Sequence, residues 1–217
     1  MDFTLDKKHE MARSLFREFA EKEVKPLAIE VDETEVFPRE TVTKMAKYGF
    51  LGIPVAKEYG GQGADPLAYV MCVEELSKVC ATTGVIVSAH TSLCADPIAM
   101  YGTPEQKEKY LVPLAKGEKL GAFALTEPNA GTDAQGAVTK AVLDGDEYVL
   151  NGSKIFITNG KEADIYVVIA CTEIKVDAKG RQKKIFSAFI VEKDTPGFGF
   201  GTKEKKMGCL LYTSPSP

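Results

Sequence analysis

Two segments combine a short apolar run with hydroxyl groups and glycine, the residue types that can hold a flat polar ring. In the first, the apolar run 122–125 leads into the polar turn 126–133. Main-chain N–H groups and two threonine hydroxyls would then lie at a strand end. Pro128 would fix the turn, and Gly131 would permit a positive φ or the close approach of a ligand. On its own, this pattern is equally typical of an ordinary strand-to-loop exit.

The second segment, residues 154–160 (KIFITNG), repeats the arrangement. Another strand-like run ends in Thr158 and is followed by Asn-Gly, a turn pair. Each strand end therefore offers one aromatic residue, Phe123 or Phe156, and one threonine, Thr126 or Thr158. A single threonine or phenylalanine at a strand end is more often structural, so the prediction of a cofactor site rests on the joint pattern.

Both segments resemble motifs of the acyl-CoA dehydrogenase family. ALTEPNAGTDAQG is similar to the signature loop of that family, and GSKIFITNG is similar to its second flavin-contacting strand. Further likenesses occur at EYGGQG, EELSKV and TPEQKEKYL, so the resemblance covers residue 1 to about residue 208. The whole run looks most similar to the bacterial short-chain, butyryl-CoA type.

The resemblance implies FAD-dependent conversion of a butyryl-CoA-like thioester to its trans-2-enoyl-CoA. This reaction needs an electron sink beside Cβ, a carboxylate base beside Cα and donors that polarise the thioester carbonyl. The family also implies an electron-transfer flavoprotein as the electron acceptor and a homotetramer for the full-length protein. Two rival hypotheses are an acyl-CoA oxidase that uses O₂ and a non-catalytic acyl-CoA or flavin binding module.

The resemblance also assigns roles to residues at the two strand ends. Main-chain groups around Leu125 and the hydroxyl of Thr126 would bond the pyrimidine edge of the isoalloxazine ring. Thr158 would lie near N5 of the ring and Phe156 along it, while Thr132 would contact the FAD phosphates and the thioester arm of bound CoA. The residues expected to bind the cofactor are Phe123, Leu125, Thr126, Thr132, Phe156, Ile157 and Thr158, and Thr132 is also expected to bind substrate.

No catalytic residue is assigned in this chain. The resemblance implies that Glu127 braces its loop and that Asp133 caps a turn or helix. It places the catalytic base, a glutamate, in a C-terminal helical domain that is expected to be missing here. The chain should therefore bind FAD weakly, fail to turn over acyl-CoA, and expose the apolar faces of 67–80 and 83–101, which favours aggregation.

The composition is that of a soluble globular protein and argues against several classes of function. The 217 residues are 44% hydrophobic and 27% charged, with a net charge of −4, so neither nucleic acid nor a membrane surface is an expected partner. No run approaches the ~18 apolar residues that span a bilayer, and no targeting pattern is present, so the expected location is the cytoplasm. The five cysteines include no Cys-x-x-Cys pair, and no metal site is predicted.

Four titratable residues have simple structural interpretations. His9 is expected at an exposed or half-exposed helix position, and His90, within an apolar helix, as a hydrogen-bonded core residue. Glu74 and Glu75 are adjacent, and neighbours on a helix point about 100° apart, so they cannot act as a facing acid/base pair. One of the two should be exposed and the other structurally paired.

Periodicity predicts a helical first part and a strand-rich second part. The first N-cap is predicted at Asp2 or Thr4, and a capping box is predicted at Thr103 and Gln106. The predicted helices are 5–27, 38–48, 67–80, 83–101 and 103–116. The predicted strands are 140–143, 148–150, 154–158, 165–172 and 186–192, with a charged loop at 173–184.

These patterns together predict an α+β fold. An all-α N-terminal domain would cover 1–118, and a small antiparallel β-domain of sandwich or barrel type would cover 119–208. The family's C-terminal helical domain would be missing. Residues 209–217 have no period and contain two prolines, so they are interpreted as an aberrant tail that is not native.

Overall fold

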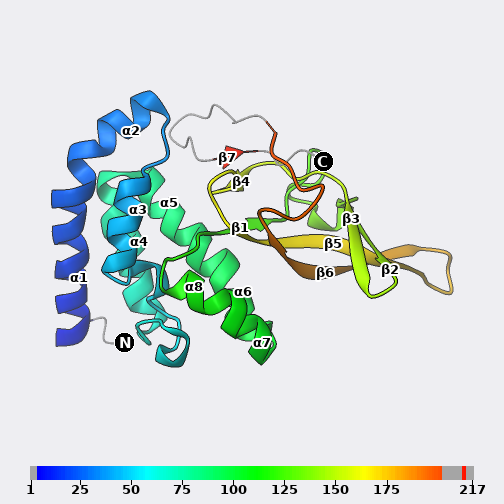
Figure 1. The fold of residues 1–217 in the computed structure, drawn as a ribbon, viewed down its shortest axis with the longest axis horizontal. Helices are drawn as coiled ribbons and strands as arrows, with labels where there is room; N and C mark the ends of the chain where they lie inside the picture. The colour runs from blue at the N-terminus through cyan, green and yellow to red at the C-terminus, as the bar shows by residue number, and fades with distance from the viewer. Residues whose placement is uncertain (1–3, 202–211, 214–217) are drawn as a thin grey trace.

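Helices and strands occupy separate halves of the molecule in the computed structural model (Figure 1). The structure describes residues 4–201 and 212–213. The helices come first in the chain and the sheet follows, which confirms the predicted order of the two parts. Within the described ranges, no helix combines the length and the hydropathy that a bilayer-spanning segment requires.

The first helical stretch runs well beyond one regular α-helix. Helix α1 (Lys7–Phe19) continues through a π-helical turn (Ala20–Val24) and a 3₁₀ turn (Lys25–Leu27) into α2 (Ala28–Thr34). Its N-cap is Asp6, whose carboxylate accepts a hydrogen bond from the His9 main-chain N–H at 2.9 Å. The prediction of Asp2 or Thr4 as the cap is therefore wrong, because the helix begins at residue 7 rather than at residue 5; Asp2 itself lies outside the described residues.

The remaining helices follow the predicted ranges. They are α3 (Arg39–Lys47), α4 (Pro66–Val79), α5 (Ala81–Ser88), α6 (Asp96–Tyr101), α7 (Pro104–Gln106) and α8 (Val112–Ala115). A π-helical turn (Ala89–Ala95) joins α5 to α6, and another (Lys107–Leu111) joins α7 to α8. Gly117 has a φ of 71°, a left-handed conformation that suits glycine and ends the last helix.

The predicted capping box at the start of α7 is confirmed. The Thr103 hydroxyl accepts from the Gln106 N–H at 3.3 Å, and the Gln106 side chain accepts from the Thr103 N–H at 2.9 Å.

Thr103→Ala should therefore lower the free energy of unfolding by about 1 kcal/mol, measured by urea denaturation. Thr43→Ala is the control, since this exposed threonine lies within α3 and caps nothing. Equal losses in the two variants would contradict the prediction.

Two apolar clusters position the helices against each other and against the sheet. The first lies among the helices and includes Phe16, Phe19, Phe50, Leu76 and Ile86. The second joins the last helices to the sheet and includes Cys94, Leu111, Leu114, Ile165 and Val167. Five large apolar side chains of the predicted 67–80 and 83–101 helices are nevertheless exposed: Leu67, Val70, Leu93, Met100 and Tyr101. Aggregation through them stays a prediction.

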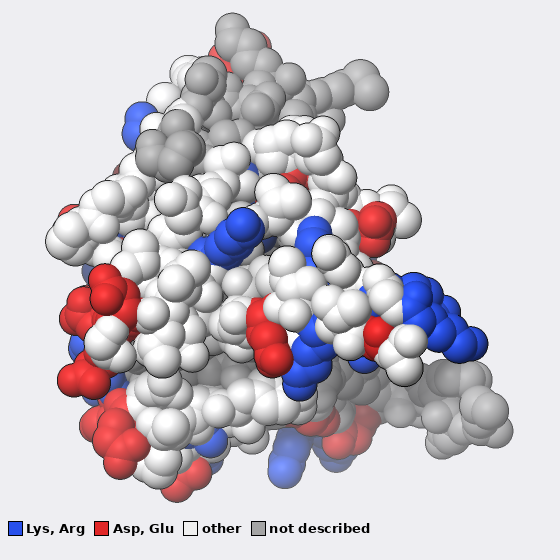
Figure 2. All heavy atoms as spheres, turned by 90° about the vertical axis from the view of Figure 1, so that its right-hand side faces the viewer, with Lys and Arg blue, Asp and Glu red and all other residues white. Residues whose placement is uncertain are grey.

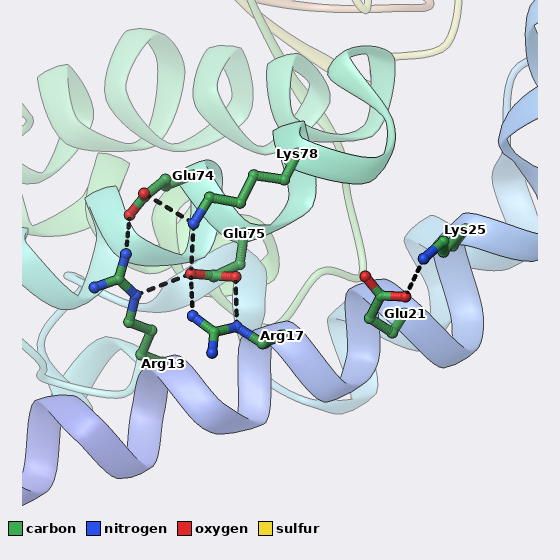
Figure 3. A network of polar contacts seen from close by, with 7 residues as sticks. All are labelled: Arg13, Arg17, Glu21, Lys25, Glu74, Glu75 and Lys78. Carbon is green, nitrogen blue, oxygen red and sulfur yellow. Dashed lines mark hydrogen bonds and ion pairs between the residues drawn. The ribbon is translucent and has the colours of Figure 1, made fainter.

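An ion-pair network joins α1 to α4 (Figure 3). Glu75, with 2% of its side chain exposed, accepts from Arg13 Nε at 2.9 Å, from Arg17 Nε at 3.0 Å and from Lys78 Nζ at 2.9 Å. Glu74 is 44% exposed and pairs with Arg13 and Lys78. The prediction of one exposed and one structurally paired glutamate is confirmed, and the exposed one is paired as well.

The sheet is mixed, so the prediction of an antiparallel domain is only partly right. Its strands are β1 (Gly121–Ala124), β2 (Lys140–Asp144), β3 (Glu147–Asn151), β5 (Ile165–Val176) and β6 (Gln182–Glu192). Strands β2 and β3 pair antiparallel, as do β5 and β6, whereas β1 and β2 both run parallel to β5. Long connections of the kind that links β1 to β5 permit parallel pairing, which periodicity cannot predict. The sandwich or barrel type stays a prediction.

Two predicted strand boundaries are wrong for local reasons. The segment 173–184 is a β5–β6 hairpin rather than a loop, with its turn held by the Asp177 carboxylate, which accepts from the main-chain N–H groups of Lys179 and Arg181. Of residues 154–158, only β4 (Ile157–Thr158) is a strand, and it pairs antiparallel with β7 (Tyr212–Thr213). Of the predicted tail 209–217, only residues 212–213 are described, so its foreign origin stays a prediction.

Charge is unevenly spread over the face seen from the right-hand side of Figure 1. Acidic side chains collect along the left edge of this face, and most basic side chains lie from its centre to its right edge (Figure 2). The β5–β6 hairpin contributes Lys175, Lys179, Arg181, Lys183 and Lys184 to the basic residues of the sheet domain.

Candidate functional site

The two segments singled out from the sequence lie against each other at the end of β1. The Ile155 N–H donates to the Thr126 carbonyl at 2.8 Å, and Lys154 Nζ donates to the Leu125 carbonyl at 2.9 Å. The first two residues of one predicted strand therefore bond the two residues that follow β1. The structure brings Leu125 and Thr126 to the same place as the segment that leads into Thr158.

A buried ion pair fixes this junction. Lys154 Nζ lies 2.7 Å from Glu127 Oε1, and the two side chains are 4% and 3% exposed. The Glu127 carboxylate also accepts from the N–H groups of Val138 at 2.6 Å and Thr139 at 3.0 Å. Glu127 is thus a loop-bracing carboxylate, as the resemblance implied: Oε1 accepts from Lys154 and from the Thr139 N–H, and Oε2 accepts from the Val138 N–H.

The electrostatics of the pair favour a charged Glu127. Burial by itself raises the pKa of Glu127, but the ammonium of Lys154 and the hydrogen bonds from the following loop outweigh it and lower that pKa to about 2. Burial lowers the pKa of Lys154, and its ion pair with Glu127 partly offsets this. A carboxylate held in this way is a poor general base near neutral pH.

The loop between these anchors is exposed. Glu127 and Ala130 exchange main-chain hydrogen bonds of 3.2 and 3.1 Å, which close a tight turn over Pro128. Thr132 lies beyond this turn and is exposed. Gly131 does not have a positive φ; instead, a methyl group added to it would meet no atom within 4 Å. Open space for a ligand, rather than an unusual φ, is what glycine provides here.

Asp133 precedes a short 3₁₀ turn (Ala134–Gly136), as a cap would. Its side chain makes no capping hydrogen bond to this turn, and only its main-chain carbonyl accepts, from the Gly136 N–H at 3.0 Å. The expected role is therefore confirmed in position but not in side-chain contact.

The second strand end has an unusual backbone. Phe156 and Asn159 have φ values of 58° and 62°, in the left-handed region that is rare for an aromatic residue. Phe156 interrupts the predicted strand 154–158 just before Ile157, and Asn159 follows directly after its end at Thr158. Local backbone strain of this kind concentrates at functional sites, because the surrounding structure must hold it.

Side-chain exposure separates the predicted cofactor residues. The Phe156 side chain is 42% exposed, whereas Thr158 is 9% exposed and Ile157 is 2% exposed. Ile157 packs in an apolar cluster with Ala122 and Ala124, so only its main chain could meet a ligand. Phe123 is half-buried against the cluster that joins helices and sheet.

Asn159 is a residue whose role the sequence analysis missed. Its side-chain amide donates to the carbonyls of Ile86 at 3.2 Å and Gly121 at 3.1 Å, which ties this strand end to α5 and to the start of β1. Its Oδ1 is buried and has no hydrogen-bond partner among the described residues. The available signal was the Asn-Gly pair, since asparagine tolerates the left-handed conformation seen here.

His90 anchors β1 from the helical side. Its Nδ1 accepts from the Gly121 N–H at 3.0 Å, so Nε2 carries the proton that it donates to the Leu114 carbonyl at 3.2 Å. Burial lowers the pKa of His90 to about 4, which keeps the ring neutral. The predicted role of a hydrogen-bonded core residue is confirmed.

Comparison with known families identifies both halves of the chain. The acyl-CoA dehydrogenase N-terminal domain matches residues 6–118, and the acyl-CoA dehydrogenase middle domain matches residues 122–213. A short-chain specific acyl-CoA dehydrogenase of Clostridium acetobutylicum is 61% identical over 208 residues. That match covers 96% of this chain and 54% of the relative, so the chain spans about half the relative's length.

Solved structures show the same fold. The butyryl-CoA dehydrogenase of Megasphaera elsdenii matches with a TM-score of 0.89 and 46% identity, over 99% of this chain and 56% of that one. A chain from a structure described as the electron transferring flavoprotein of Acidaminococcus fermentans matches with a TM-score of 0.90 and 52% identity, over 99% and 55%. An acyl-CoA dehydrogenase complexed with FAD, from Bacillus anthracis, matches with a TM-score of 0.86 and 38% identity, over 97% and 35%. The chain therefore belongs to the acyl-CoA dehydrogenase family.

Proposed function

We propose that this chain is the FAD-binding part of a short-chain acyl-CoA dehydrogenase that converts butyryl-CoA-like thioesters to trans-2-enoyl-CoA. The observation that supports this most directly is the junction at the end of β1, where Lys154 and Ile155 hold the main chain of Leu125 and Thr126. Relatives described as short-chain specific and as butyryl-CoA dehydrogenases support the substrate class.

The residues present fit a flavin. The half-exposed ring of Phe156 offers a surface along which a flat ring can pack, and the open space beside Gly131 leaves room for a bulky ligand. Leu125 would bond the pyrimidine edge through its main chain, with the Thr126 hydroxyl beside it and Thr158 near N5. A related structure complexed with FAD supports FAD as the cofactor.

FAD, when bound, supplies the acceptor for the hydride that leaves Cβ of the thioester. The described residues would hold and orient the ring, and Thr132 would meet the cofactor phosphates and the thioester arm. Glu127 does not serve as the base for the Cα proton, because its carboxylate is buried in an ion pair and its pKa is about 2. No base for this proton is assigned among the residues of the two strand ends.

The remaining assignments are part of the same proposal. Residues 1–118 and 119–208 would be the helical and sheet domains. An electron-transfer flavoprotein would accept the electrons, which the related chain from the Acidaminococcus fermentans structure supports. The full-length protein would be a homotetramer, and its cytoplasmic location stays a prediction from the sequence.

Titration of the purified 217-residue chain with FAD tests the proposed function. The wild-type chain should bind FAD weakly, and replacing both Thr126 and Thr158 with valine should raise the dissociation constant at least tenfold, since two hydrogen bonds to the ring would be lost. Thr195→Val, at an exposed turn position, is the control and should leave the constant unchanged.

The same preparation should not oxidise butyryl-CoA. Absence of FAD binding to the wild-type chain, or an equal effect of the control, would contradict the proposal. Turnover with stoichiometric oxygen consumption would favour the acyl-CoA oxidase instead.

A further inference from the structure

One lysine of the β5–β6 hairpin holds the loop that follows β1. Lys184, on β6, extends its ammonium to the carbonyls of Gly136 at 3.0 Å and Ala137 at 2.7 Å. It lies 47 residues along the chain from Ala137, so this is a tertiary contact between the hairpin and the loop. Its neighbour Lys183 points to the opposite face of the strand, because side chains alternate along β-structure.

Four successive residues at the end of the loop are held by two charged side chains. The Lys184 ammonium donates to the carbonyls of Gly136 and Ala137, and the Glu127 carboxylate accepts from the N–H groups of Val138 and Thr139. A cation thus meets carbonyl dipoles, and an anion meets the amides that follow them. Hydrogen bonds to charged groups are the stronger class, so this end of the loop is fixed from both sides.

The start of the loop is fixed by Lys154, the ion-pair partner of Glu127, and by Ile155. Lys154 binds the Leu125 carbonyl, and Ile155 binds the Thr126 carbonyl. Between the two ends lies the exposed turn that includes Gly131 and Thr132. An exposed loop anchored at both ends keeps its shape before a ligand arrives, which reduces the ordering cost of binding.

The partners of Lys184 show that loop fixation, rather than surface charge pairing, explains its position. Lys184 is half-buried, and among the described residues its hydrogen bonds go to neutral carbonyls, with no carboxylate within ion-pair distance. Ordering a long lysine side chain loses rotamer entropy. Two short charge-assisted hydrogen bonds to the same loop offset that loss.

We propose that Lys184 is a positioning residue for the cofactor-binding loop. By holding the carbonyls of Gly136 and Ala137, it sets the path of the chain that carries Gly131 and Thr132 and so prepares the loop for FAD. This inference rests on the proposed function for its ligand, but the loop fixation itself is a property of the chain without cofactor.

The test compares Lys184→Met and Lys184→Arg with Lys183→Met, a matched control that removes the same charge from the adjacent, exposed position. Hydrogen exchange is measured without cofactor at the amides of residues 136–139, which all donate hydrogen bonds in the structure: the first two to main-chain carbonyls and the last two to the Glu127 carboxylate. FAD affinity and the urea denaturation midpoint are measured on the same 217-residue chains.

Lys184→Met should accelerate exchange at these amides about tenfold and weaken FAD binding about tenfold. Each effect corresponds to the loss of roughly one net charge-assisted hydrogen bond. Lys184→Arg should recover most of both, since a guanidinium can also donate to two carbonyls. The Lys183→Met control should match wild type. A denaturation midpoint that falls equally in Lys184→Met and Lys184→Arg while loop exchange stays unchanged would overturn the proposal.

The design separates this inference from the proposed function. If wild type binds FAD but hydrogen exchange of the loop is unchanged in Lys184→Met, only the positioning role is overturned. Faster loop exchange in Lys184→Met, with no FAD binding by any chain, overturns the proposed function and leaves the loop fixation by Lys184 supported.

Discussion

Replacing Lys154 with methionine is expected to lower the free energy of unfolding by about 3 kcal/mol or more. The substitution keeps the apolar stem but leaves Glu127, only 3% exposed, without its ammonium partner. Removing one member of a buried ion pair costs about 3–5 kcal/mol, because the remaining charge stays buried and uncompensated. Part of that cost would be relieved by protonation of Glu127, so the loss should be smaller at low pH.

Lys161→Met is the matched control for this experiment. Lys161 lies in the same segment and is exposed, and only its main-chain carbonyl accepts a hydrogen bond, from Lys193. Urea denaturation should show a change within about 0.5 kcal/mol for this variant. The double variant Glu127→Gln/Lys154→Met should recover part of the loss, because no buried charge remains. Additive losses in the double variant would contradict the account.

Local patterns predicted most of the helices because their signals are short in range. The capping box at Thr103 and Gln106 needs only residues three apart, and it forms as expected. The first helix begins later than predicted because Asp6, rather than Thr4, is its N-cap. The two polar residues lie close together in the sequence and compete for this role. Such errors move a boundary without changing the fold.

The sheet was harder to predict because its pairings are long in range. The parallel alignment of β1 with β5 joins Gly121 to Ile165, and no local pattern encodes a partner 44 residues away. The β5–β6 hairpin was mistaken for a charged loop because its residues from Glu173 onward on β5 are exposed and need no apolar alternation. Exposed strands therefore look like loops in the sequence.

For the candidate site, the sequence identified the two segments but not what joins them. The threonines and aromatic residues of both strand ends were predicted from their types and order. The sequence pattern assigns Lys154 only to a strand, and its pairing with Glu127, 27 residues away, follows from tertiary structure. The left-handed Phe156 was equally unpredictable, since a phenylalanine in an apolar run normally favours extended backbone.

The second large effect is expected at Glu75, where α1 meets α4. The hydrogen bond from Arg17 contributes most to lowering the pKa of Glu75, from the ordinary 4.5 to about 2, against the opposing effect of burial. That fall corresponds to about 3 kcal/mol of stability. Because Arg13 and Arg17 are 32% and 59% exposed, solvent screening reduces the expected contribution to about 2 kcal/mol.

Glu75→Gln should therefore be less stable than wild type by about 2 kcal/mol at neutral pH, and the difference should depend on pH with a definite sign. A carboxyl whose pKa is lower in the folded state stabilises fully above its unfolded value, and this stabilisation is lost as the pH falls toward the folded value. The difference in unfolding free energy between wild type and Glu75→Gln should thus be constant above about pH 5 and shrink below about pH 4.5.

Glu74→Gln, at the adjacent 44% exposed position of the same network, should differ from wild type by at most about 1 kcal/mol at every pH. Urea denaturation of the three chains between pH 7 and pH 3 measures both gaps. A gap for Glu75→Gln that widened on acidification, or that equalled the gap for Glu74→Gln, would show that the α1–α4 joint is held by apolar packing rather than by the buried carboxylate.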